Sequence, residues 1–155
     1  MLYTLKKADE QAMREITEEM RIRKTNEIFL LFVLGSQFDH LIKQVLDRLG
    51  VFCLVCDPAS VTAEDVRRVN PKGIILSGGP VSVYEEPPPF DERIFDLGIS
   101  VLGICLGFQL WAQHIGATVS RGEKAEFGVH TFSRKSGLTE QAAGLLAGCD
   151  WEMPV

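Results

Sequence analysis

The sequence has no apolar run that could cross a membrane and no excess of positive charge. Apolar runs such as residues 28–34 and 99–104 are far shorter than the roughly 20 residues that a membrane-spanning helix needs. Sixteen Lys and Arg residues stand against 21 Asp and Glu residues, which gives a net charge of −5. Because nucleic acids and anionic lipid surfaces select positively charged proteins, we expect neither nucleic acid nor a membrane as a partner.

Residues 1–26 also lack a targeting signal. They contain no apolar stretch typical of a secretion signal, and their acidic residues argue against an organelle transit peptide. A cytoplasmic location is therefore expected, and in that reducing compartment the cysteines should be thiols rather than disulfides. The four cysteines are Cys53, Cys56, Cys105 and Cys149.

The cysteines and histidines do not form a metal-binding pattern, because no second pair of them stands at ligand spacing. Cys53 and Cys56 are spaced like a redox pair, but redox pairs lie at the start of a helix. These two fall within and just after an apolar strand. We therefore predict two core cysteines and no metal site.

The composition and the periodicity predict one α/β domain. Of the 155 residues, 46% are hydrophobic, which is enough for a compact core. From residue 27 onward, short apolar runs alternate with helical patterns, and repeated strand, helix, strand units imply right-handed crossovers. The predicted fold is doubly wound α/β, a mostly parallel sheet with helices on both faces. The predicted strands are residues 28–34, 51–55, 73–76 and 101–104, and the predicted helices are residues 36–49, 62–69, 91–97 and 106–115.

The two ends of the chain depart from this pattern. Residues 1–26 show helical spacing among charges, which predicts an amphipathic helical extension in front of a domain of residues 27–155. Beyond residue 117 the pattern weakens and no closing element is recognisable, so the domain is expected to be incomplete at its C-terminal end. The residues that carry the N-terminal spacing are Leu5, Ala8, Ala12, Ile16 and Met20, and the weak later segments are strands at 117–120 and 127–132 and a helix at 138–146.

The loop after the fourth predicted strand carries a candidate nucleophile. Gly103, Cys105 and Gly107 form a G-x-C-x-G sequence between a buried strand and a helix, which is typical of a nucleophile elbow. In such a turn the nucleophile takes a strained conformation, and the glycines leave space for neighbouring chain. The positive end of the following helix favours a thiolate. A buried cysteine between two packing glycines is the alternative.

Two other features provide hydrogen-bond donors and a substrate contact for a thiolate that attacks a carbonyl group. The developing oxyanion needs hydrogen-bond donors, and the backbone N–H groups of Leu106 and of the Gly78, Gly79 pair are candidates. Gln109 follows Cys105 by four residues, so it lies on the same face of the helix and can contact whatever Cys105 attacks. A plain turn before Pro80 is the alternative for the glycine pair.

A general base for this cysteine is not evident. His114 lies nine residues along the helix that Cys105 begins, on the opposite face and about 13 Å away. His40 lies within the first predicted helix of the domain, where a solvated or core imidazole is favoured, and His130 stands in a weakly patterned segment. The sequence therefore predicts a nucleophile without an imidazole to serve it.

Three loops together carry a family resemblance. They are Leu-Gly-Ser-Gln-Phe at 34–38, Pro-Lys-Gly-Ile-Ile-Leu-Ser-Gly-Gly-Pro at 71–80 followed by Ser-Val-Tyr at 82–84, and Val-Leu-Gly-Ile-Cys-Leu-Gly-Phe-Gln at 101–109. The chain resembles the class I glutamine amidotransferase domain over residues 27–128, and within that family the N-terminal glutaminase half of GMP synthetases. The resemblance implies a flavodoxin-like sheet.

The resemblance also implies a chemistry. Cys105 would attack the side-chain amide of L-glutamine, form a glutamyl thioester and release ammonia. The oxyanion donors would be the backbone at Gly79 and Leu106. The substrate-binding positions would be Gln109, Gly78 and Ser36, and the elbow glycines Gly103 and Gly107. No cofactor is expected in this domain. In GMP synthetases the ammonia passes to a separate synthetase domain or subunit that uses ATP and Mg²⁺ to convert XMP to GMP.

The sequence departs from the family at two places. Val33 stands where the family has an acidic residue before its Gly-Ser-Gln, so the hydrogen bonding of this loop is expected to differ. The family's His and Glu partners lie well downstream of the cysteine, and no His-x-Glu occurs before Val155. A truncated glutaminase is the simplest interpretation; an inactive pseudo-glutaminase that serves as a binding module is the competing one, and a cysteine-elbow hydrolase of other specificity is a third.

Overall fold

The computed structural model describes residues 4–84, 86–120, 131–132 and 153–154, and it forms two compact units, Met1–Val119 and Ser120–Val155. The described part of the second unit is a two-stranded antiparallel sheet of β6 (Thr131–Phe132) and β7 (Met153–Pro154). Two residues of the strand expected at 127–132 are therefore strand. The helix expected at 138–146 lies outside the described residues, and residues 117–120 are irregular rather than a strand.

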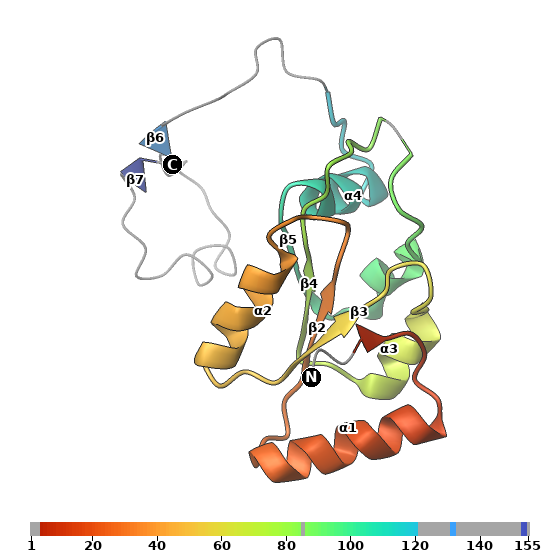
Figure 1. Cartoon of the computed structure of the whole chain (residues 1–155). Coiled ribbons are helices and arrows are strands. Elements are labelled where there is room, and N and C mark those ends of the chain that lie inside the picture. The colour runs from red at the N-terminus through yellow and green to blue at the C-terminus, as the bar shows by residue number, and fades with distance from the viewer. Residues whose placement is uncertain (1–3, 85, 121–130, 133–152, 155) are drawn as a thin grey trace. The chain divides into compact units, whose positions relative to one another are not determined.

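The first unit is built on a parallel sheet of five strands in the order β1-β3-β2-β4-β5 (Figure 1). Each pair of neighbours runs parallel, and the predicted doubly wound α/β fold is confirmed. Because all carboxyl ends of parallel strands lie at one edge, the loops after β2, β4 and β5 share that edge. The strands are β1 (Thr4–Leu5), β2 (Phe29–Phe32), β3 (Cys53–Cys56), β4 (Gly73–Leu76) and β5 (Ser100–Gly103).

The helices follow the predicted spacing closely. The four helices predicted between residues 36 and 115 are present, although residues 92–97 form a 3₁₀ helix rather than an α-helix. None of the helices in the described part of the chain is long and apolar enough to span a bilayer. The helices are α1 (Glu10–Arg23), α2 (Asp39–Arg48), α3 (Ala63–Val69), η1 (Glu92–Leu97) and α4 (Leu106–His114).

The N-terminal segment differs from the expected helix. The helix begins only at Glu10, where the Asp9 carboxylate accepts from the backbone N–H of Ala12 at 2.9 Å. Thr4–Leu5 is instead an edge strand that pairs with the end of β3. Leu5 and Ala8 match helical spacing because both point into the same core as the buried residues of α1, although they precede the helix.

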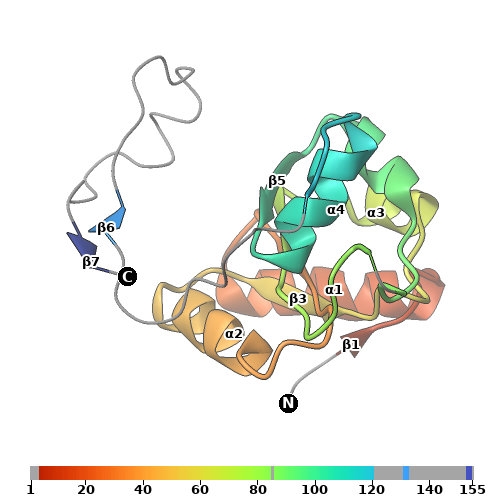
Figure 2. The same ribbon diagram turned by 90° about the horizontal axis from the view of Figure 1, so that it is seen from above.

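The sheet separates two apolar layers, and Figure 2 shows the helices that lie around it from above. Alternate strand residues point to opposite faces, so Leu30 joins one layer and Leu31 the other. The larger layer receives buried side chains from α1, α3, η1 and α4, whereas the smaller one is covered by Ile42 and Leu46 of α2. Helices on both faces are what an all-parallel sheet requires.

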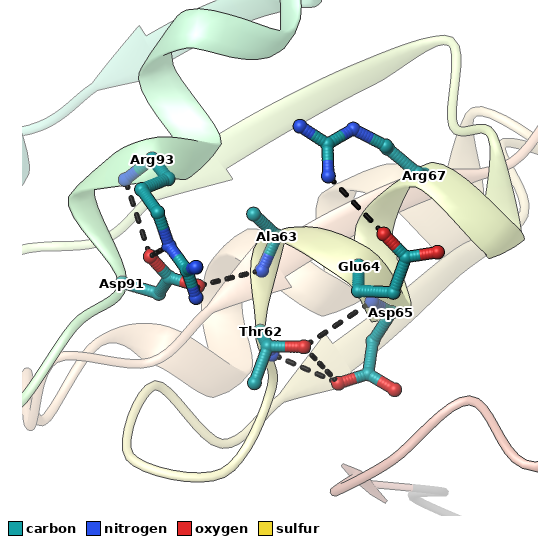
Figure 3. A network of polar contacts seen from close by, with 7 residues as sticks. All are labelled: Thr62, Ala63, Glu64, Asp65, Arg67, Asp91 and Arg93. Carbon is teal, nitrogen blue, oxygen red and sulfur yellow. Dashed lines mark hydrogen bonds and ion pairs between the residues drawn. The ribbon is translucent and has the colours of Figure 1, made fainter.

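A network of carboxylates joins the amino ends of α3 and η1 (Figure 3). Thr62 and Asp65 form a reciprocal capping box at the start of α3, and Asp65 also accepts from the N–H of Ala8 at 2.8 Å. Asp91 caps η1 and accepts from the N–H of Ala63 at 2.8 Å. The Arg93 guanidinium lowers the pKa of Asp91 to about 2, and the backbone hydrogen bonds act in the same direction.

Candidate active site

Cys105 lies in the turn between β5 and α4 with a conformation that L-amino acids rarely adopt. Its φ is +52° and its ψ is −109°. Lys24 and Asn70, the other described non-glycine residues with positive φ, are ordinary left-handed caps at helix ends. The Cys105 side chain is exposed. The turn therefore has the strain and the exposed sulfur of a nucleophile elbow, as the sequence predicted, rather than a buried core cysteine.

The two glycines beside Cys105 are required by the packing of this turn. A Cβ on Gly103 would lie 2.6 Å from the backbone nitrogen of Phe108, and a Cβ on Gly107 would lie 2.6 Å from the carbonyl oxygen of Leu76. Both distances are below any normal contact, and both involve backbone. The G-x-C-x-G sequence thus allows α4 to start directly against the ends of β4 and β5.

Three loops converge at Cys105, as the common edge of the parallel strands requires. A Cβ on Gly78 would lie 3.5 Å from the Cβ of Cys105 and 3.9 Å from the Cβ of Ser36. Gly78 itself is buried. The loops after β2, β4 and β5 therefore meet at Gly78, and any side chain there would fill the space between the other two loops.

Two backbone donors near the cysteine have no partner within the described residues. The N–H of Leu106 is the first of α4 and has no acceptor, and the N–H of Gly79 likewise donates to no described residue. Leu106 is buried, and a Cβ on Gly79 would lie 2.7 Å from the carbonyl oxygen of Leu34. Buried or close-packed amides without partners are uncommon, and oxyanion holes are one place where they occur.

Ser77 ties the loops after β2 and β4 together. Its side chain is fully buried. Its hydroxyl oxygen accepts from the N–H of Leu34 at 2.8 Å, and the hydroxyl donates to the carbonyl oxygen of Gly78 at 3.0 Å. Its backbone carbonyl accepts from the N–H of Gly107 at 3.1 Å. One residue thus bonds to all three loops, although the sequence analysis did not single it out.

Asp39, in the first turn of α2, faces the same place. Its Oδ1 is buried and has no hydrogen-bond partner. Burial raises the pKa of this carboxyl, against the lowering effect of the Ser77 side chain and of the backbone at Gly35 and Ser36. A carboxylate therefore does approach the Gly-Ser-Gln loop, from Asp39 rather than from the position of Val33. In the sequence, Asp39 is only an acidic residue three positions after Ser36. An acidic residue is common in the first turn of a helix, so it did not stand out as a site residue.

The predicted substrate-contacting side chains are held by local hydrogen bonds. The Ser36 hydroxyl oxygen accepts from the N–H of Phe38 at 3.1 Å, which shapes the turn into α2. Gln109 is half-buried on α4, and its side-chain oxygen faces the N–H of Val83 at 3.5 Å. Gln109 therefore reaches from the elbow helix to the Ser-Val-Tyr loop at 82–84.

Neither of the described histidines forms a hydrogen bond with Cys105. His40 is exposed on α2. His114 ends α4, where its Nε2 lies 2.9 Å from Asp96 and its Nδ1 lies 3.5 Å from Glu92. The hydrogen bond with Asp96 raises the pKa of His114, and Glu92 adds to the effect. His130 lies outside the described residues.

Cys53 and Cys56 are core residues, as predicted. Cys53 and Cys56 are both buried in β3 but belong to different apolar layers. Burial raises the pKa of Cys53 to about 12 and raises that of Cys56 well above its usual value. Cys149 lies outside the described residues. Within the part of the chain that the structure describes, no group of three His, Cys, Asp or Glu side chains could hold a metal ion.

Comparison with known proteins agrees with this geometry. Residues 30–149 match the family described as glutamine amidotransferase class-I. The glutamine-hydrolyzing GMP synthase of Staphylococcus epidermidis is 43% identical over 118 residues, which are 76% of this chain and 23% of that protein. The corresponding enzyme of Heliobacterium modesticaldum is 40% identical over 132 residues, which are 84% of this chain and 24% of that protein.

A solved structure also resembles this chain. It is the crystal structure of a Thermoplasma acidophilum protein provisionally described as one subunit of a GMP synthase, with a TM-score of 0.67 and 26% identity over 83% of this chain and 62% of that one. The chain spans about a quarter of the length of the curated relatives described above.

Proposed function

The chain belongs to the class I glutamine amidotransferase family, and on that premise we propose that it is a glutaminase domain of the GMP synthetase type, with Cys105 as its nucleophile. The observation that carries the proposal is the elbow itself. Cys105 has a strained backbone and is exposed. The amide of Leu106, which directly follows it, and that of Gly79, next to Gly78 where the loops meet, have no acceptor within the described residues.

The proposed reaction converts glutamine and water to glutamate and ammonia. The Cys105 thiolate forms a bond to the side-chain amide carbon, and the carbonyl oxygen becomes an oxyanion that accepts from the N–H groups of Gly79 and Leu106. The tetrahedral intermediate collapses, the C–N bond breaks, and the nitrogen takes a proton and leaves as ammonia. Water then attacks the glutamyl thioester, which releases glutamate and returns the thiol.

No general acid or base for proton transfer is identified among the described residues. The leaving nitrogen and the attacking water both need a general acid or base, and within the described residues neither His40 nor His114 is hydrogen-bonded to Cys105. Loss of a catalytic base lowers rates by several orders of magnitude in comparable enzymes. We therefore expect this 155-residue chain alone to form the thioester and release ammonia only slowly.

The ammonia acceptor belongs to the proposal as well. The related proteins are named as GMP synthases, and in such enzymes an ATP- and Mg²⁺-dependent synthetase domain or subunit would use the ammonia to convert XMP to GMP. Our proposal places these cofactors with that partner and none in this domain. A cytoplasmic location fits the proposal, since the described cysteines are all free thiols.

Covalent labelling tests the proposal without requiring turnover. A diazoketone analogue of glutamine should alkylate Cys105, with loss of N₂ from the carbon that forms the new C–S bond, and free glutamine should protect the thiol. Peptide mass spectrometry locates the label. An inactive binding module of this fold would show no labelling over many hours, or labelling that glutamine does not slow.

A further inference from the structure

The only buried side-chain nitrogen or oxygen without a hydrogen-bond partner in the described residues is Oδ1 of Asp39. A buried acceptor without a donor is costly, so its persistence at this position calls for a physical reason. The carboxylate does not lie in the stabilising networks of the fold. It lies beside Ser77, Gly35 and Ser36, at the edge where the three loops converge on Cys105.

The side-chain donor that faces this carboxylate, the Ser77 hydroxyl, is already engaged. Ser77 has a single hydroxyl hydrogen, which it donates to the carbonyl oxygen of Gly78 at 3.0 Å. Asp39 and the Gly78 carbonyl therefore compete for one hydrogen. A hydroxyl hydrogen rotates freely about its C–O bond, so it can pass from one acceptor to the other without moving a heavy atom.

The direction of the Ser77 hydroxyl hydrogen matters because it is bonded to the carbonyl of the Gly78–Gly79 peptide. The carbonyl of Gly78 and the N–H of Gly79 belong to the same planar trans peptide and point in opposite directions. While Ser77 holds the Gly78 carbonyl, the direction of the Gly79 N–H is fixed as well. When the hydroxyl turns to Asp39, the Gly78 carbonyl loses this hydrogen bond, and the peptide between the two glycines can change its orientation.

We propose that Asp39 is a positioning residue for the Gly79 oxyanion donor: by taking the Ser77 hydrogen, it releases the Gly78–Gly79 peptide to align with the oxyanion that forms on Cys105. This inference rests on the proposed glutaminase function. It assigns Asp39 no contact with substrate, because its effect passes through Ser77. Asp39 thus supplies the Gly-Ser-Gln loop with a carboxylate from α2.

The electrostatics of Asp39 agree with a role in function rather than stability. Burial raises the pKa of its carboxyl, so above that pKa the folded protein bears the cost of keeping the charge. The stability contribution of this group is therefore greatest at acidic pH and falls as pH rises through the folded-state pKa. Asp39→Asn removes the charge, and at neutral pH its midpoint of thermal unfolding should equal or exceed that of the unchanged chain.

The test compares two reagents on the full chain. The diazoketone analogue of glutamine needs the oxyanion site, whereas iodoacetamide needs only an accessible thiol. Asp39→Asn should lower the maximal inactivation rate of the analogue roughly tenfold, less than the 10²–10³-fold cost of removing an oxyanion donor. Its half-saturating concentration and the iodoacetamide rate should stay within about twofold. Asp47→Asn, an exposed carboxylate on the same helix, is the matched control and should change neither rate.

A second variant separates the path through Ser77 from a direct effect. In Ser77→Ala the hydrogen is absent, so adding Asp39→Asn to it should have no further effect. Equal analogue rates for Asp39→Asn and the unchanged chain would overturn the inference, as would a parallel loss of iodoacetamide reactivity or of thermal stability. If Ser77→Ala does not fold, the ratio of the analogue rate to the iodoacetamide rate in Asp39→Asn still tests the inference. If glutamine does not protect Cys105 of the unchanged chain from the analogue, the proposed glutaminase function itself is wrong, whatever the result for Asp39→Asn.

Discussion

Two groups of carboxylates in this protein have opposite environments. At the amino ends of α3 and η1, Asp65 and Asp91 accept hydrogen bonds from backbone and side chains, and the pKa of each is lowered (Figure 3). For Asp65 burial opposes the shift, but the bonds from Thr62 and Ala8 outweigh it. At the carboxyl ends of the strands, Asp39 has a buried oxygen without a partner and a raised pKa.

The backbone shows the same contrast. The caps of α3 are an extended Thr62 and a left-handed Asn70, both common at helix ends, and their hydrogen bonds are made. The turn at Cys105 instead combines a φ of +52° with a ψ of −109°, which lies outside the left-handed helical region, and the amides of Gly79 and Leu106 have no acceptor within the described residues. Satisfied polar groups stabilise a fold, and strained or unsatisfied ones persist where chemistry requires them. The contrast supports the proposed site at the strand ends independently of any sequence motif.

The largest effect should come from Cys105. Cys105→Ser should abolish labelling by the glutamine analogue and any release of ammonia, because a hydroxyl is far less nucleophilic at neutral pH. Cys105→Gly should also be unreactive, but it should raise the free energy of unfolding by about 1 kcal/mol, since glycine relieves the positive φ. Mass spectrometry and denaturant unfolding measure the two effects. A Gly variant less stable than the Ser variant would contradict the account of strain.

Adjacent glycines should respond differently to the same substitution. In Gly79→Ala the new Cβ meets the Leu34 carbonyl at 2.7 Å, so we expect a loss of about 2–3 kcal/mol in unfolding free energy. In Gly78→Ala the Cβ makes ordinary contacts, the nearest at 3.5 Å to Cys105, so stability should change by less than about 1 kcal/mol. Because that methyl group fills the space between loops, labelling by the analogue should still fall at least about tenfold.

The order of the two stability losses is the decisive outcome for this pair. Gly78→Ala as destabilising as Gly79→Ala would mean that the space beside Cys105 is packed core. A folded Gly78→Ala variant labelled at the normal rate would show that the space is not used by the glutamine analogue.

A smaller effect is expected at the structural carboxylates. Asp91→Asn should lower the free energy of unfolding by about 1 kcal/mol, because it weakens a cap shared between η1 and the N–H of Ala63. Cys105 labelling should be unchanged. The benefit of Asp91 is present above the unfolded-state pKa of about 4 and is lost as pH falls toward about 2. Urea unfolding at pH 7 and pH 2.5 should therefore show a larger difference between variant and parent at the higher pH.

The smallest effect concerns His114, which joins α4 to η1 through Asp96 and Glu92. Its pKa is raised in the folded protein, so the stabilisation is full below the unfolded-state value and declines as pH rises through the folded-state value. The difference in unfolding free energy between the parent and His114→Gln should be larger at pH 5.5 than at pH 8.5. Labelling of Cys105 should not follow this difference, since His114 does not serve the nucleophile.

Sequence periodicity predicted the elements and the elbow because both are local. The helix after the cysteine and the glycines beside it are each specified within a few residues, and a parallel sheet brings the strand-end loops together. The pairing of Thr4–Leu5 with β3 is not local, and a two-residue edge strand has too few residues to show a period. Ser77 and Asp39 lie 38 residues apart and have ordinary local patterns, so their meeting appears only in three dimensions.

The most direct measurement is glutamine protection of Cys105 in the unmodified chain. The account predicts that the diazoketone analogue labels Cys105 and neither of the buried thiols Cys53 and Cys56, and that millimolar glutamine slows this labelling while glutamate or asparagine does so far less. Labelling that is spread over the cysteines, or a rate at Cys105 that glutamine leaves unchanged, would contradict it.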